Sequence, residues 1–141
     1  MICDFGLATI VLPDGRARRP FEKDPYQKLP DFYTETQSYC FGTPRSTAPE
    51  IVLGHVYGFP SDMWSLGVII YEMITGRAPW SGEEENFTTL YERILDTQPE
   101  FVPSEWLDAG LWLNVRGLLR TDPSRRPTIG EVLFSRTFLQ L

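Results

Sequence analysis

Histidine and cysteine are scarce in this chain, and their scarcity excludes several kinds of site. One histidine, His55, and two cysteines, Cys3 and Cys40, occur among the 141 residues. A lone histidine excludes a histidine-rich metal site and gives no support to a catalytic triad built on histidine. Two distant cysteines provide neither a metal-binding spacing nor a disulfide framework. We therefore expect two reduced thiols in an intracellular protein, cytoplasmic or nuclear.

Positive charge and long hydrophobic runs are also in short supply. The 13 lysines and arginines face 19 aspartates and glutamates, which gives a net charge of -6. Such a balance argues against a general nucleic-acid binder. The longest apolar stretch, residues 63–74, is interrupted by Ser65 and Glu72 and is shorter than the ~20 residues of a membrane span. Because the N-terminus has no positively charged segment, we expect neither a secretion signal nor contact with a membrane.

The composition is that of a chain with a hydrophobic core. Hydrophobic residues make up 42% of the sequence and aromatic residues 13%, which argues against disorder. The length fits one ordinary domain. Residues 13–40 form a separate segment, in which four prolines and charges of both signs disfavour a helix. A loop of this length in a compact domain is usually functional or disordered.

Apolar periodicity predicts a mainly α fold. After Pro60 we expect a long helix, with Ser61 and Asp62 at its N-cap and first turn and Gly76 at its C-cap. Its apolar residues cover nearly every face, which predicts a helix buried among neighbours on all sides. Helical spacing and a capping box predict three more helices, which contain Phe87, Leu90, Tyr91, Ile94 and Leu95, then Leu111, Val115, Leu118 and Leu119, then Thr128, Ile129, Glu131, Val132 and Leu133.

Four short motifs occur in a meaningful order. They are Asp4-Phe5-Gly6, then Gly42-Thr43-Pro44 with Ala48-Pro49-Glu50, then Asp62-Met63-Trp64-Ser65-Leu66-Gly67, and last Asp122-Pro123-Ser124-Arg125-Arg126-Pro127-Thr128. Each is weak alone, but together they resemble the distal half of a eukaryotic protein-kinase domain over essentially the whole chain. The resemblance implies the helical C-terminal lobe of the kinase fold, without the N-lobe and the catalytic loop. Residues 4–50 would be the activation segment and residues 60–141 the helical lobe.

The resemblance implies roles in phosphoryl transfer for the first motif. Asp4 corresponds to the aspartate that binds the magnesium ion bridging the ATP phosphates, and a hard cation prefers such a carboxylate. Phe5 would pack into the core, and Gly6 would allow the backbone change between active and inactive states. The alternative for Asp4 is an ordinary exposed aspartate in a turn. The expected cofactors of the parent kinase are ATP and Mg²⁺, and its substrate is a protein.

The second motif resembles the loop that seats the substrate beside the acceptor hydroxyl. Thr43 corresponds to the threonine that helps orient the catalytic aspartate in serine/threonine kinases. The next three residues depart from the family pattern, because Arg45-Ser46-Thr47 stands where an acidic residue, a tyrosine and an aliphatic residue are usual. Four hydroxyl residues lie where activating phosphorylation commonly occurs, and an unmodified polar loop is an equal alternative. These candidate phosphosites are Thr34, Thr36, Ser38 and Tyr39.

Other residues correspond to structural positions of the kinase lobe. Glu50 and Arg126 resemble the buried ion pair that ties the activation segment to the last helices. Asp62 resembles the aspartate that caps the backbone of the catalytic loop. The alternative interpretation is that Asp62 simply stabilises the first turn of its helix, where a negative charge is favourable. Glu72 lies where some kinases contact an arginine of the substrate, although a general feature of this helix is the better interpretation.

Several parts of the kinase machinery have no counterpart in the sequence. There is no glycine-rich G-x-G-x-x-G loop and no His-Arg-Asp catalytic loop among these residues, and phosphoryl transfer requires both. We expect a partial kinase domain that is inactive by itself, so whether the chain is an enzyme stays open. The alternative is a catalytically dead lobe that acts in protein binding. Because part of the packing around the long apolar helix would be missing, we also expect self-association.

Overall fold

The described part of the chain is mainly α-helical, as predicted. The computed structural model describes residues 11–16, 43–80, 86–101 and 109–135, and no β-strand occurs within these ranges. The helical elements are η1 (Pro44–Ser46), α1 (Pro49–Val52), α2 (Phe59–Thr75), α3 (Phe87–Asp96), α4 (Ala109–Leu118), η2 (Pro123–Arg125) and α5 (Ile129–Leu133), where η marks a 3-10 helix. No helix in the described ranges is long and apolar enough to cross a membrane.

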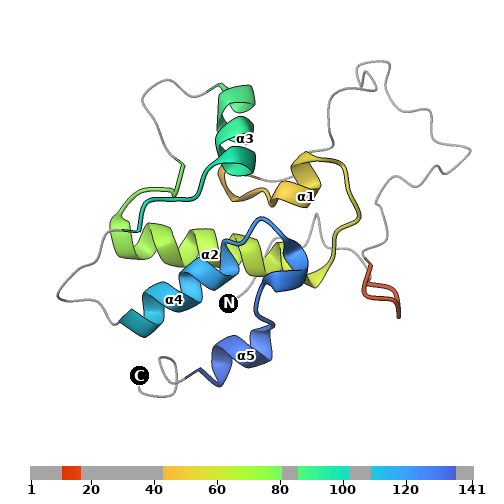
Figure 1. The fold of residues 1–141 in the computed structure, drawn as a ribbon. Helices are drawn as coiled ribbons and strands as arrows, with labels where there is room; N and C mark the ends of the chain where they lie inside the picture. The colour runs from red at the N-terminus through yellow and green to blue at the C-terminus, as the bar shows by residue number, and fades with distance from the viewer. Residues whose placement is uncertain (1–10, 17–42, 81–85, 102–108, 136–141) are drawn as a thin grey trace, which may run out of the picture.

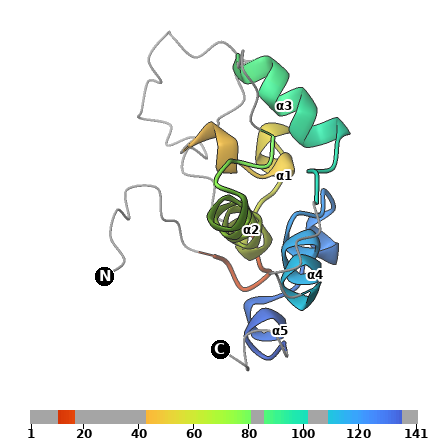
Figure 2. The ribbon, with the colours of Figure 1, turned by 90° about the vertical axis from the view of Figure 1, so that its left-hand side faces the viewer.

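The long helix α2 is the centre of the arrangement. Figure 1 shows α1 and α3 on one side of α2 and α4 and α5 on the other. Figure 2 looks nearly along α2. In this view all four helices lie to the right of α2, with α1 and α3 above its level and α4 and α5 below it. The described helices therefore cover α2 unevenly, which bears on the burial of its side chains.

The ends of α2 are set by a proline and two glycines. Gly58 is the N-cap, and Pro60 lies in the first turn, where its fixed φ suits a helix and its missing N–H is not needed. The prediction of Ser61 as N-cap is therefore wrong, because the helix begins earlier, although Asp62 does lie in the first turn. At the other end Gly76 adopts the predicted left-handed C-cap, with φ 74°.

The prediction that α2 is buried on all sides is only partly confirmed. Trp64, Val68 and Tyr71 are almost completely buried. By contrast, Ile69 is 52% exposed and Met73 80% exposed. Among the described elements, neighbours thus bury one side of α2 and leave an apolar stripe on another.

The core joins α2 to its neighbours. Its largest cluster contains Ala48, Trp64, Val68, Tyr71, Trp80, Leu90, Ile94, Val115 and Leu119. A smaller cluster of Met63, Leu118 and Val132 connects α2, α4 and α5. The helices predicted around Phe87, Leu111 and Thr128 are all found. The predicted capping box of Thr128 and Glu131 is present at the start of α5.

Gly67 lies where α2 packs tightly against the C-terminal end of α4. A Cβ atom built at position 67 would lie 2.8 Å from Cβ of Leu118 and 3.0 Å from Cδ2 of Leu119. Both leucines are fully buried, so neither can move into solvent to make room. The backbone of Gly67 has ordinary helical geometry, so its conformation does not require glycine. The close approach of Leu118 and Leu119 does.

We predict that Gly67→Ala lowers the free energy of unfolding by about 1–3 kcal/mol, because overpacking outweighs the gain in helix propensity. Gly117→Ala is the matched control. It lies in α4, and a Cβ there would meet Pro127 at an ordinary 3.5 Å, so this variant should keep or raise stability. Urea unfolding of both variants is the measurement, and equal stabilities would show that α2 and α4 are not in tight contact at Gly67.

Candidate functional site

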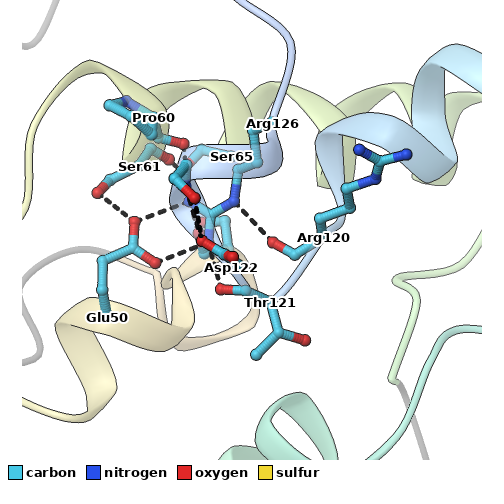
Figure 3. Close-up of polar contacts among 10 residues, drawn as sticks. Glu50, Pro60, Ser61, Ser65, Arg120, Thr121, Asp122 and Arg126 are labelled. Carbon is cyan, nitrogen blue, oxygen red and sulfur yellow. Dashed lines mark hydrogen bonds and ion pairs between the residues drawn. The ribbon is translucent and has the colours of Figure 1, made fainter.

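A buried ion pair links two segments that are far apart in sequence. Nη1 of Arg126 donates to Oε1 of Glu50 at 2.7 Å, and Nη2 donates to Oε2 at 2.7 Å, across 76 residues of chain (Figure 3). Glu50 is only 4% exposed and Arg126 only 6%. The pair expected from the two motifs is therefore present, with the bidentate geometry that a guanidinium and a carboxylate favour.

Every nitrogen of the Arg126 guanidinium has a partner. Beyond Glu50, Nη1 donates to the carbonyl of Pro60 at 2.8 Å and Nη2 to that of Thr121 at 3.1 Å. Nε donates to the carbonyl of Arg120 at 2.8 Å. Figure 3 shows these oxygens converging on one side chain from α1, from the start of α2 and from the loop after α4. Such complete hydrogen bonding is what allows a charge to be buried.

Two residues of α2 complete the surroundings of the pair, and sequence reasoning missed both roles. Ser61, predicted as an N-cap, instead donates its hydroxyl to Oε1 of Glu50 at 2.6 Å. The Trp64 ring lies under the guanidinium of Arg126, 5.0 Å from its central carbon, and stacks on Trp80 at 5.1 Å. Serine and tryptophan at these places carry no local signal of their partners, which come from other segments of the chain.

These contacts set the charge state of Glu50. Burial opposes ionisation, but the hydrogen bonds from Arg126 and Ser61 and the charge of Arg126 outweigh it, so the pKa of the Glu50 carboxyl lies below its ordinary value of 4.5. Glu50 is thus ionised at neutral pH, and the pair carries both charges.

The short helix η1, just before α1, is fixed onto α2. The hydroxyl of Ser65 in α2 donates to the carbonyl of Ser46 at 3.0 Å. The hydroxyls of Ser46 and Thr47 both donate to the carbonyl of Thr43, at 3.0 and 3.3 Å. Thr43, the predicted substrate-loop threonine, is exposed at the N-cap of η1. Arg45 lies in the middle of η1 and is also exposed.

Asp62 differs from the other acidic residues of the site. It is exposed to solvent, yet nearby atoms remove enough water to raise the pKa of its carboxyl, and no residue of the described ranges donates a hydrogen bond to it. The partner expected from the resemblance is therefore not found within the described ranges.

The remaining predicted site residues lie outside the described residues, and their roles stay predictions. They are Asp4, Phe5 and Gly6, for magnesium and ATP, and the candidate phosphosites Thr34, Thr36, Ser38 and Tyr39. Within the described ranges, no group of three or more histidine, cysteine, aspartate or glutamate residues is placed to hold a metal ion.

We predict that Arg126→Ala lowers the free energy of unfolding by about 3–5 kcal/mol, because it leaves the Glu50 carboxylate buried without its partner. Adding Glu50→Ala should then cost little more, since the two side chains act as one unit. Arg125→Ala is the matched control, because Arg125 is 74% exposed and pairs with the exposed Asp122; it should cost less than about 1 kcal/mol. Chemical unfolding of Arg126→Ala, Glu50→Ala, the double variant and the Arg125→Ala control measures the cycle, and additive losses for the pair would contradict the coupling.

The lowered pKa of Glu50 predicts a pH dependence with a definite sign. Below the ordinary value of 4.5, the unfolded chain takes up a proton that the folded chain still refuses, so stability falls with acidification. Glu50→Gln should flatten this fall in melting temperature.

Asp62→Asn should act in the opposite sense. Because the pKa of Asp62 is raised, removal of its charge should stabilise the protein at neutral pH and lose its effect in acid. Melting temperatures between pH 3 and 7 test both, and parallel curves for all variants would refute the assignment.

Comparison with known proteins agrees with this arrangement. The family model described as "Protein kinase domain" matches residues 1–138. The chain is 37% identical over 125 residues to the serine/threonine-protein kinase YPK2/YKR2 of Saccharomyces cerevisiae, covering 89% of this chain and 15% of that protein. It is 35% identical over 104 residues to the human hormonally up-regulated neu tumor-associated kinase, covering 74% of this chain and 14% of that protein. The chain thus spans about one-seventh of the length of these relatives, and it belongs to the protein kinase domain family, of the serine/threonine type.

Proposed function

We propose that this chain forms the substrate-seating part of a serine/threonine kinase, which transfers a phosphoryl group from ATP to a protein serine or threonine. The buried pair of Glu50 and Arg126 carries the proposal. It fixes the end of the segment that precedes α1, so that η1 and the exposed Thr43 keep one position on α2. Residues 4–50 would act as the activation segment and residues 60–141 as the helical lobe. We place this activity inside the cell, in the cytoplasm or the nucleus.

The first motif, Asp4-Phe5-Gly6, would bind the metal ion and the nucleotide. Asp4 would hold Mg²⁺ on the ATP phosphates, and Phe5 and Gly6 would set the active geometry. The ion, when bound, neutralises negative charge on the phosphates. Thr43 would orient the catalytic aspartate toward the substrate hydroxyl.

By itself the chain would transfer no phosphate. Its sequence contains neither a glycine-rich loop nor a His-Arg-Asp loop, so it supplies neither the phosphate cradle nor the general base. Phosphoryl transfer depends on positioning and electrostatic stabilisation, and both would be lost together. The complete reaction therefore needs polypeptide that provides those groups.

A catalytically dead lobe that binds proteins is the second candidate. The exposed apolar residues of α2 favour it, because Ile69 and Met73 present hydrophobic surface. The same surface favours self-association of the isolated chain. The kinase function is favoured by the presence of Thr43, Glu50 and Arg126, because a module that only binds proteins does not need a substrate-loop threonine.

We predict that the isolated chain binds Mg-ATP weakly or not at all, whereas a fusion behind the preceding part of the YPK2/YKR2 kinase domain phosphorylates peptides on serine. Calorimetry tests the first statement and transfer of labelled phosphate the second. Asp4→Ala in the fusion should abolish transfer, since it removes the proposed magnesium ligand, and Asp14→Ala serves as a control because Asp14 is an exposed loop carboxylate. A fusion that folds but transfers no phosphate would favour the binding module, and micromolar Mg-ATP binding by the isolated chain would contradict the proposed division of roles.

A further inference from the structure

We propose that the connection between α1 and α2 is the surface through which two copies of this chain form a symmetric pair. Three large apolar side chains of this connection are exposed, Leu53 at 50%, Val56 at 50% and Phe59 at 63%. We call these three side chains the connection surface. In Figure 1 the connection (yellow) loops outward from α1 before it enters α2. The inference does not depend on the kinase function, because it concerns assembly and not phosphoryl transfer.

The backbone at the start of the connection is held in place. The N–H of Leu53 donates to the carbonyl of Pro49 at 2.9 Å, and the N–H of His55 donates to the carbonyl of Glu50 at 2.8 Å. Gly54, between them, has φ 67°, a left-handed conformation that suits glycine. The side chain of Glu50 is in turn fixed by its buried ion pair. A surface on a fixed backbone loses less entropy in a contact than a mobile loop does.

The connection carries no exposed acidic or basic side chain apart from its histidine. From residue 46 to residue 61, Glu50 is the only aspartate, glutamate, lysine or arginine, and it is buried in its ion pair. Two copies of a chain with net charge -6 repel each other. An apolar surface without charges of its own lets such copies approach without placing like charges in contact, which favours a second copy as the partner.

The exposed apolar residues of α2 are the competing surface, but acidic side chains accompany them. Asp62 is exposed and lies seven residues before Ile69, which places the two on the same side of the helix. Glu72 is also exposed and directly precedes Met73. Contact between two copies of this surface would bring the carboxylates of both copies together, and like charges repel. The connection surface is therefore the better place for a contact between identical chains.

A symmetric contact also makes good use of a small surface. In a two-fold pair the same patch is used by both partners, so three apolar side chains of one copy meet the same three of the other. The driving force is the removal of this apolar area from water. Because the area is small compared with the roughly 800 Å² per partner of a stable complex, we expect a weak association that depends on protein concentration.

Sedimentation velocity of the whole chain tests the proposal. The average mass should rise with protein concentration from that of one chain toward that of two. It should rise further when salt is added, because salt screens the repulsion between the two acidic copies. Phe59→Lys and Val56→Lys should each weaken the association by at least about tenfold, since they place a charge in the contact of each copy. A mass that stays at one chain over all concentrations overturns the inference.

Two further lysine variants control for the change in net charge. Phe134→Lys makes the same substitution at a side chain that is 77% exposed, at the end of α5, and it should leave the association unchanged. Met73→Lys introduces a lysine into the competing surface of α2, at a side chain that is 80% exposed, and it should also leave the association unchanged. Association that Phe59→Lys leaves intact, or that either control weakens as much, overturns the inference.

A mixture of two variants tests whether the connection surface meets itself. Phe59→Lys and Phe59→Glu should each associate poorly, because a symmetric contact places like charges opposite one another. Their equimolar mixture should associate more strongly than either variant alone, since the charges that then meet are opposite. The kinase activity plays no part in these measurements, so their outcome and that of the proposed function are independent. A mixture that associates no better than its components overturns the symmetric contact.

Discussion

The buried charge of Arg126 is the constraint on which much of this structure depends. A guanidinium away from water is tolerated only when its donors are satisfied, and here the donors reach Glu50, Pro60, Arg120 and Thr121. Those partners belong to α1, to the first turn of α2 and to the loop after α4. Three separate segments must therefore be in place before the charge is satisfied. Trp64 adds an apolar wall beneath the guanidinium, which keeps water away from the pair.

The same pair connects the fold to the proposed function. Glu50 lies at the beginning of α1, and η1 ends four residues before it, so fixing the carboxylate also fixes the chain that carries Thr43. Ser61 and Ser65, one turn apart on α2, hold this region at two places, one at Glu50 and one at Ser46. In the proposed function, η1 would present its exposed side chains to a substrate from this rigid support, which lowers the entropy lost on binding.

The helix α2 serves as a scaffold on one side and presents an open surface on the other. Gly67 permits close approach of α4, and Trp64 and Tyr71 fill the core. On the exposed surface lie Ile69 and Met73, and partial desolvation raises the pKa of Asp62.

The sequence by itself determined the features that depend on near neighbours. Helical spacing predicted α3, α4 and α5, the capping box at Thr128 was correct, and Gly76 ended α2 as expected, because these signals act within about four residues. The motifs also predicted the family and the partnership of Glu50 with Arg126. Tertiary structure alone decided that Ser61 donates a hydrogen bond to Glu50 instead of capping a helix, and that Trp64 lies beneath Arg126. It also decided that Ile69 and Met73 of α2 are exposed. These outcomes depend on which distant segments pack together, and no local pattern specifies them, because the same side chain can satisfy a near or a distant partner equally well.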